Sequence, residues 1–375
     1  VQDNNLEGSQ LLFNCNFRRK KIGKLSVFSI IFKAMKNYVH SIALLILGCC
    51  LLGCSATTVV SEKINGVSFV ASRDTLQQKH ITPLLEIHAD YAAIMPFGFV
   101  RDKNHPELHF NSERQWFGER YEGVKQYIEL LHENEIKVML KPHIWIWRGV
   151  FTGDMEMDSE ADWVLFENSY EEFILLYAQL AEETHADLLC IGTELFNFVD
   201  QRPDFWKQLI KKVRATYTGK ITYAENWDKV DRVAIWEDLD FIGADAYFPV
   251  SEAQTPTIED ALAGWKPHKK LLASLSKQYS KPVLFTEFGY RSADYAGKEP
   301  WASDRYEGKM NSEAQAQLYE ALFKSFWDEP WFAGGFAWKW FHNHDRAIQQ
   351  ENNRFTPQGK QAEEVLKKWY QNSVN

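Results

Sequence analysis

The sequence predicts a single (β/α)8 TIM barrel, an α/β fold in which parallel strands alternate with helices. From residue 64 to the end, short apolar runs alternate with helical patterns, and no Gly/Ser-rich linker or internal repeat interrupts them. The chain has 375 residues, which is enough for one such barrel. Two of the apolar runs end in a glutamate, which suits a fold whose active sites lie at the carboxyl ends of its strands. A doubly wound open sheet is the alternative.

The predicted strands are short apolar runs bounded by polar or turn-forming residues. They span residues 64–71, 91–99, 136–143, 187–194, 221–226, 241–247, 283–287 and 335–340. Helical patterns fill the gaps, at residues 120–134, 168–184, 203–217, 258–279, 312–327 and 357–370. We therefore assign residues 64–375 to one barrel domain.

The N-terminal region does not belong to this barrel. Residues 1–34 contain a basic cluster and no pattern that would join it, so we expect an upstream extension that is absent from the mature protein. Residues 35–54 resemble a bacterial lipoprotein signal peptide. In that segment Lys36 precedes an apolar run that is too short to be a typical transmembrane helix.

The apolar run ends in Leu-Leu-Gly-Cys, which resembles a lipobox with Cys54 as its last residue. The resemblance implies cleavage before Cys54 and lipidation of its sulfur, with residues 55–63 as a polar linker. An ordinary cleaved signal peptide or a membrane anchor is the alternative. The sequence thus predicts an exported protein of the bacterial cell envelope, lipid-anchored to a membrane in the periplasm or at the cell surface.

Composition excludes some classes of partner and cofactor. The net charge of −9 and the isoelectric point near 5.7 argue against a general affinity for nucleic acid. The five cysteines suggest no disulfide framework, and Cys190 lies in a predicted buried strand. No Cys/His spacing matches a zinc site and no Gly-rich phosphate loop is present, so we expect chemistry without a metal or other cofactor. The 14 tryptophans and 15 tyrosines suit a protein that binds sugar rings on aromatic faces.

The residues at the carboxyl ends of the predicted strands are the candidates for an active site. They lie at 96–101, 141–147, 193–197, 225–227, 245–248, 287–291 and 338–344, and they are rich in carboxylates, aromatic residues, asparagine and histidine. Cleavage of a glycosidic bond needs one acid to protonate the leaving oxygen and one carboxylate to meet an oxocarbenium-like centre. Glu194 and Glu287 end two parallel strands and suggest such a pair.

Several of these strand ends carry a recognisable set of motifs. They are Lys-Pro-His-Ile-Trp from residue 141, Gly-Thr-Glu ending at 194, Asp-Ala-Tyr from 245, Phe-Thr-Glu-Phe-Gly-Tyr from 285 and Trp-Lys-Trp-Phe from 338. The set resembles the large clan of retaining barrel glycosidases and most resembles glycoside hydrolase family 113, known for endo-acting β-mannanases. The resemblance covers roughly residues 64–370. It implies that Glu194 is the acid/base and Glu287 the nucleophile.

The predicted substrate-binding residues share these strand ends. They are Lys141, His143, Trp145, Thr193, Asn226, Trp227, Tyr247, Trp338 and Trp340. Trp338 and Trp340 are two residues apart on a predicted strand, so their side chains share one face. Both are expected to point inward, with at least one stacking on a sugar. Tyr247 could donate its hydroxyl to the nucleophile or belong to the core, and His143 could be neutral or shuttle protons.

Two further points concern specificity and ionisation. Many clan members have asparagine where this chain has Thr193, so the group that binds the sugar 2-hydroxyl is expected to differ here. Arg101 and Arg291 could pair with a carboxylate or be solvated.

The function predicted first is a retaining glycoside hydrolase acting on a β-linked glycan, with β-1,4-mannan as the first substrate. A second possibility is another β-glycosidase of the clan, acting on β-glucan or an aminosugar glycan, because the acid pair reports the mechanism and not the sugar. A third is a surface glycan-binding lipoprotein without catalysis. The presence of both glutamates argues against the third.

Overall fold

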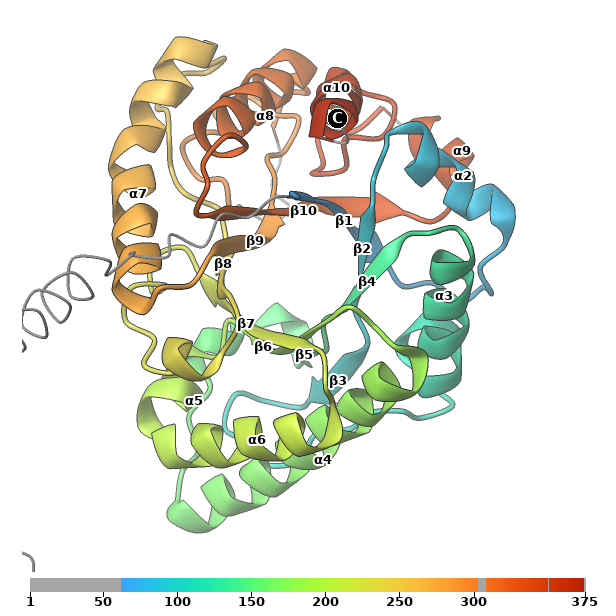
Figure 1. Cartoon of the computed structure of the whole chain (residues 1–375), viewed down its shortest axis with the longest axis vertical. Coiled ribbons are helices and arrows are strands. Elements are labelled where there is room, and N and C mark those ends of the chain that lie inside the picture. The colour runs from blue at the N-terminus through green and yellow to red at the C-terminus, as the bar shows by residue number, and fades with distance from the viewer. Residues whose placement is uncertain (1–61, 303–307, 350, 374–375) are drawn as a thin grey trace, which may run out of the picture. The chain divides into compact units, whose positions relative to one another are not determined.

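The computed structural model describes residues 62–302, 308–349 and 351–373, and these form a closed barrel of parallel strands (Figure 1). The order around the barrel is β1, β10, β9, β8, β7, β6, β4, β2. The strand bounds are β1 (Ile64–Val70), β2 (Tyr91–Ile94), β4 (Lys137–Leu140), β6 (Leu188–Thr193), β7 (Lys220–Asn226), β8 (Ile242–Asp245), β9 (Val283–Phe288) and β10 (Phe332–Phe341). Because β1 pairs with both β2 and β10, the sheet has no open edge. The predicted barrel is confirmed, and the open sheet is excluded.

Three segments that the sequence analysis singled out lie wholly or mostly outside the described residues. They are the upstream extension, the signal peptide with Cys54, and all but the last two residues of the linker. Within the ranges that the structure describes, no helix is both long and apolar enough to cross a lipid bilayer.

Helices surround the barrel (Figure 1). Their bounds are α2 (Gln78–Glu86), α3 (Tyr121–Glu133), α4 (Glu160–Thr184), α5 (Phe196–Gln201), α6 (Pro203–Thr216), α7 (Ile258–Tyr279), α8 (Ser312–Phe326), α9 (His344–Ile348) and α10 (Gln361–Ser373). Long helices begin where a side chain replaces a missing backbone acceptor: Ser159, Thr257 and Asn311 each accept a hydrogen bond from the N–H three residues further on. The sequence patterns missed α2, α5 and α9, and they placed the start of α4 eight residues late, at 168 instead of 160.

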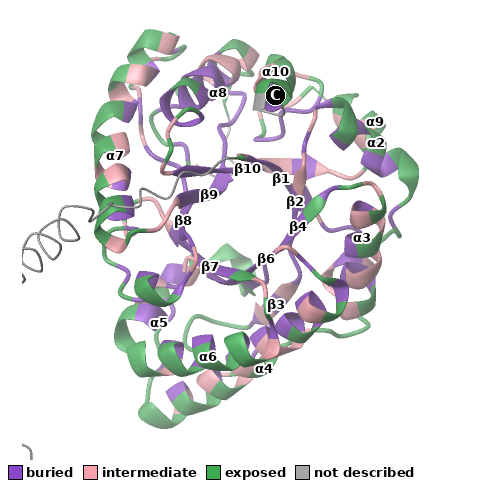
Figure 2. Cartoon of the chain, in the orientation of Figure 1, coloured by how far each residue is buried: buried purple, intermediate pink, exposed green. Residues whose placement is uncertain are grey.

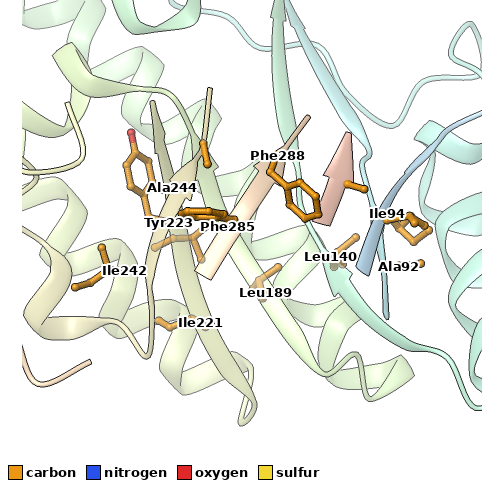
Figure 3. Packing of buried hydrophobic residues seen from close by; sticks show 14 of the residues in the cluster. Ala92, Ile94, Leu140, Leu189, Ile221, Tyr223, Ile242, Ala244, Phe285 and Phe288 are labelled. Atoms are coloured by element: carbon orange, nitrogen blue, oxygen red, sulfur yellow. The ribbon is translucent and has the colours of Figure 1, made fainter. Parts of the chain in front are cut away.

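The apolar core has two layers, because successive side chains of a strand point to opposite faces. Ala92 and Leu189 belong to the layer between strands and helices, which Figure 3 shows from close by. Their neighbours Ala93 and Cys190 belong to the smaller cluster inside the barrel. Buried residues accordingly line the strands, while exposed residues lie on the outer helix faces (Figure 2). Cys190 is a free, buried cysteine, as predicted.

Two predicted strands are each interrupted by a proline. The run 91–99 divides into β2 and β3 (Phe97–Val100), and the run 136–143 ends as β4 before a further strand, β5 (His143–Ile146), begins. Pro96 and Pro142 lie at the two breaks, and neither has an N–H to give to a ladder. Beyond them β3 and β5 pair as a separate parallel two-stranded sheet. This extension carries His143 and Trp145 past the end of β4.

Candidate active site

A cavity of about 1000 Å³ lies at the carboxyl ends of the barrel strands. We call it the active-site cavity. The predicted site residues that line it are Trp145, Glu194, Asn226, Tyr247, Glu287 and Trp338. An adjoining cavity of about 470 Å³ shares both glutamates with it and adds His143 and Thr193. The structure therefore brings most of the predicted site residues together.

Glu287, near the carboxyl end of β9, is held by two donors. The Lys141 Nζ lies 2.6 Å from its Oε1, and the Tyr247 hydroxyl donates a hydrogen bond of 2.8 Å to its Oε2. His143 Nε2 is 3.8 Å from the same Oε1. Gly289 follows at a close approach of the chain to β10, where a Cβ would lie 2.6 Å from the Trp338 carbonyl oxygen. Both oxygens of the predicted nucleophile are therefore fixed in place.

Lys141 is a buried counter-ion. Its side chain is 0% exposed, and its Nζ also lies 3.2 Å from Asp245 Oδ1, which in turn accepts a 2.7 Å hydrogen bond from Thr286. Burial opposes the charge, but the carboxylates of Asp245 and Glu287 outweigh it and raise the pKa of Lys141. The prediction that Lys141 contacts substrate is wrong, because the side chain contacts carboxylates beneath the cavity and has no exposed surface.

The charge balance of this cluster is negative, since one cation faces two carboxylates. Burial and Asp245 raise the pKa of Glu287 to about 7, while Lys141 and Tyr247 act in the opposite direction. The arginines considered from the sequence are not the cation that pairs with Glu287, which is Lys141. Arg101 pairs with its neighbour Asp102 at 3.4 Å, and the Arg291 Nε donates to the Asn353 carbonyl.

Glu194 has a different environment. It follows β6, adopts a left-handed backbone conformation with φ 52°, and donates its N–H to the Ala224 carbonyl at 2.7 Å. Burial, followed by the charges of Asp245, Glu287 and Glu225, raises the pKa of Glu194 well above its ordinary value, with Lys141 opposing. Of the two glutamates, only Glu287 has a cation within ion-pair distance in the part of the chain that the structure describes. A proton shared by the pair therefore favours Glu194.

The backbone beside Glu194 is tied to β7. The Leu195 N–H donates to the Tyr223 hydroxyl at 2.7 Å, and that hydroxyl donates to Glu225 Oε2 at 2.8 Å. Glu225 Oε1 accepts the N–H of Asn226 at 2.8 Å. Tyr223 and Glu225 are fully buried, so water does not replace these bonds. The chain of hydrogen bonds links the segment of Glu194 to that of Asn226, across two strands.

We expect Tyr223→Phe to lower kcat about tenfold or more, because Glu194 loses its fixed position. The variant also leaves the buried Leu195 N–H without an acceptor, which should lower the free energy of unfolding by about 1 to 3 kcal/mol. Steady-state kinetics and urea unfolding measure both effects. Tyr217→Phe is the matched control, since Tyr217 is a buried tyrosine that donates to the Ala186 carbonyl at 2.6 Å, at the start of β6. An equal loss of kcat in both variants would contradict the positioning role.

The two tryptophans of β10 point to different places. Trp338 lines the active-site cavity and lies parallel to His143, with ring centroids 6.5 Å apart. Trp340 is 0% exposed and stacks on His344 inside the core, so its predicted contact with substrate is wrong. The register of β10 against β1 shifts between Ala337 and Trp340, and this bulge breaks the alternation on which the prediction rested.

The remaining predicted residues lie at or behind the cavity walls. Trp145 is 40% exposed on β5 and lines the active-site cavity. His143 is buried, and burial with the Lys141 charge lowers its pKa well below the ordinary value, which favours the neutral ring. Thr193 lines the adjoining cavity, and its Oγ1 has no hydrogen-bond partner among the described residues. Trp227 stacks behind Trp301 at 5.2 Å instead of lining the cavity.

Sequence reasoning missed several lining residues because loops supply them. Phe151, Trp301, Arg354 and Phe355 line the active-site cavity, and all four lie outside the strand-end segments that the sequence marked. No motif in the sequence marks them. Trp301 gives the one signal, because it is a large aromatic residue outside the apolar runs of the predicted strands, and it is exposed in the structure.

One group of described residues could hold a metal ion. His105, Glu107 and His109 place one ligand atom each within 4.8 Å of one another, in the segment between β3 and α3. None of the three lines the active-site cavity. This group of three residues is therefore separate from the site of Glu194 and Glu287.

The chain is similar to known proteins in its sequence and in its fold. The model of one protein family, Glycoside Hydrolase Family 113, matches residues 69–360. A search of curated protein sequences found no match.

Solved structures share the fold. The GH113 β-mannanase of Alicyclobacillus acidocaldarius is 23% identical, with a TM-score of 0.72 over 83% of this chain and 98% of that one. A GH113 β-1,4-mannanase solved as a complex is also 23% identical, with a TM-score of 0.71 over 83% and 99%. A β-glucuronidase from Faecalibacterium prausnitzii is 13% identical and aligns at a TM-score of 0.54, over 83% of this chain and 49% of its own. At these identities the likeness shows the barrel.

Proposed function

Because the chain belongs to Glycoside Hydrolase Family 113, we propose that it cleaves β-1,4-mannan with retention of configuration, with Glu287 as nucleophile and Glu194 as acid/base. The observation that carries the proposal is the unequal environment of the two glutamates. Glu287 has Lys141 at 2.6 Å and the Tyr247 hydroxyl at 2.8 Å, both of which favour its ionised form. Glu194 faces three carboxylates, which favour its protonated form.

This asymmetry supports a double displacement. In the first step Glu287 attacks the anomeric carbon, and the Glu194 proton passes to the glycosidic oxygen as its bond to the sugar breaks. The product is a glycosyl-enzyme ester on Glu287. In the second step Glu194, now ionised, takes a proton from water, and the water oxygen attacks the anomeric carbon and frees Glu287. Tyr247 and Lys141 hold the nucleophile in one orientation through both steps.

The choice of mannan rests on the relatives and on the cavity. The solved family members to which the chain is similar are β-mannanases. The aromatic side chains of Trp145, Trp301 and Trp338 around the active-site cavity suit a neutral sugar chain that stacks on flat faces. A β-glucan or an aminosugar glycan remains the alternative substrate, because the acid pair acts on any of them.

A glycan panel with product analysis tests the proposal. Purified protein is incubated with β-1,4-mannan, β-1,4-glucan and an aminosugar glycan, and new reducing ends are measured. We expect release from mannan with the largest kcat/KM. If only another glycan is cleaved, that glycan is the substrate and mannan is not. If the protein binds a glycan but cleaves none of them, the glycan-binding alternative is favoured.

We expect Trp338→Ala to raise KM or lower kcat on a long glycan, because the sugar loses a stacking face. The loss should correspond to about 1 to 3 kcal/mol in kcat/KM, with the fold intact. Trp340→Ala is the matched control: it removes a core side chain, so it should lower the free energy of unfolding by about 3 to 5 kcal/mol. Kinetics and thermal unfolding separate the two. If Trp338→Ala leaves kcat and KM unchanged, the glycan does not stack on Trp338.

We further infer a lipid anchor from the sequence Leu-Leu-Gly-Cys that ends at Cys54. Such an anchor would hold the enzyme at a membrane of the bacterial envelope. Cys54→Ala should move the protein from the membrane fraction to the soluble exported fraction, as measured by immunoblotting of fractionated cells. Persistence of the variant in the membrane fraction would exclude this anchor.

A further inference from the structure

A third cavity, of about 420 Å³, lies at the same end of the barrel. Its walls come from the segment that follows β1, the segment that follows β10, and Trp116. Arg354 lines both this cavity and the active-site cavity, so the two are neighbours. We call it the arginine cavity, and neither step of the proposed reaction uses it.

The charge of the arginine cavity is opposite to that of the protein. Arg73, Arg346 and Arg354 line it, whereas Asp74 is the only acidic residue among the described residues that line it. The chain as a whole has a net charge of −9. A local excess of cations on an acidic protein attracts anionic ligands and does so over the range of a Debye length, about 8 to 10 Å.

These arginines also differ from others in the chain. Arg202 lies 2.6 Å from Glu167, and Arg214 lies 2.7 Å from Asp240. In contrast, Arg73, Arg346 and Arg354 have no ion pair with any residue that the structure describes. Their guanidinium groups keep the paired N–H donors that match a carboxylate.

An aromatic face accompanies the charges. Trp116 lines the arginine cavity and is 43% exposed. The Arg73 guanidinium lies 5.6 Å from the Trp116 ring centroid, which holds it at the cavity wall. A flat apolar ring beside guanidinium groups suits a sugar ring that carries a carboxylate.

We propose that the arginine cavity is a distal subsite for a sugar that carries a carboxylate, as in a hexuronic acid unit of the glycan. This inference rests on the proposed glycosidase function, because the subsite binds a part of the chain whose cleaved bond lies at Glu194 and Glu287. The enzyme then prefers glycans that bear acidic units at a distance from the cleaved bond. Arg73 and Arg346 act as specificity residues in this scheme.

Two matched oligosaccharides test the subsite. One is a β-1,4-manno-oligosaccharide, and the other is the same preparation after partial oxidation of its primary alcohols to carboxylates. For each protein, the ratio of kcat/KM on the oxidised form to that on the neutral form is measured. We expect a ratio above one for the unmodified enzyme, and a decrease of about tenfold in the double variant Arg73→Gln/Arg346→Gln, mainly through KM. Added salt should lower the ratio as well.

Arg232→Gln is the control, because Arg232 is exposed and lines neither cavity. It should leave the ratio unchanged. A ratio of one or less in the unmodified enzyme, or a ratio that the double variant retains, would overturn the subsite.

A failure of the proposed function gives a different result, since neither oligosaccharide would then be cleaved. In that case binding of the same two preparations is measured by titration calorimetry. Tighter binding of the oxidised form that the double variant loses would still support the subsite. Equal or absent binding of both forms would overturn it.

Discussion

Glu287→Gln abolishes turnover of every glycoside, because the amide cannot form the covalent ester on which both steps depend. We expect kcat to fall by about four orders of magnitude or more on natural glycans and on aryl glycosides alike. The substitution keeps the shape of the side chain, so substrate binding should persist. Kinetics with a β-mannan and with an aryl β-mannoside measure the effect.

The exposed residue Glu172 on α4 provides the control, since Glu172→Gln makes the same chemical change at a residue that lines neither the active-site cavity nor the adjoining one. It should keep full activity. A Glu287 variant that still turns over an aryl glycoside within tenfold of the unmodified enzyme would remove Glu287 from the nucleophile role.

Glu194→Gln separates the two steps. Cleavage of natural glycans should fall about 10²- to 10⁴-fold, because their leaving oxygen needs a proton. An aryl glycoside with a good leaving group needs none, so its phenol should appear in a burst, followed by slow hydrolysis of the glycosyl-enzyme. Azide should accelerate that slow phase by replacing water, because azide needs no general base.

Rapid-mixing absorbance of the released phenol measures both phases of this reaction. A loss of the same size as in Glu287→Gln on an aryl glycoside, with no burst and no rescue by azide, would show that Glu194 is not the acid/base.

Hydrophobic pattern was enough to predict the barrel. Each barrel strand contains a short apolar run, and the two layers of core use successive residues such as Leu189 and Cys190. The pattern also predicted that Glu194 and Glu287 lie close together, because the parallel strands of a barrel end at one face. Both residues line the active-site cavity. The pattern did not divide the strands at Pro96 and Pro142, because apolar residues lie within two positions on both sides of each break.

Details of the site depend on tertiary contacts that no spacing encodes. Trp340 is buried because a bulge in β10 changes the register against β1, and period-two reasoning assumes a regular strand. Lys141 serves Glu287 because β4 and β9 face each other across the barrel, at a sequence separation of 146 residues. Trp301 and Arg354 reach the cavity from loops, whose paths are set by the whole fold.

The anomeric configuration of the first product tests the assignment of Glu194 and Glu287 most directly. A retaining pair acts with carboxyl groups about 5 to 5.5 Å apart, whereas an inverting pair leaves about 6.5 to 9.5 Å for a water molecule. Proton NMR is recorded during the first minutes of hydrolysis, before mutarotation mixes the anomers. We expect the β anomer to appear first from a β-linked mannan, with the α anomer rising later. An α anomer that appears first would contradict a covalent intermediate on Glu287, and with it the roles assigned to both glutamates.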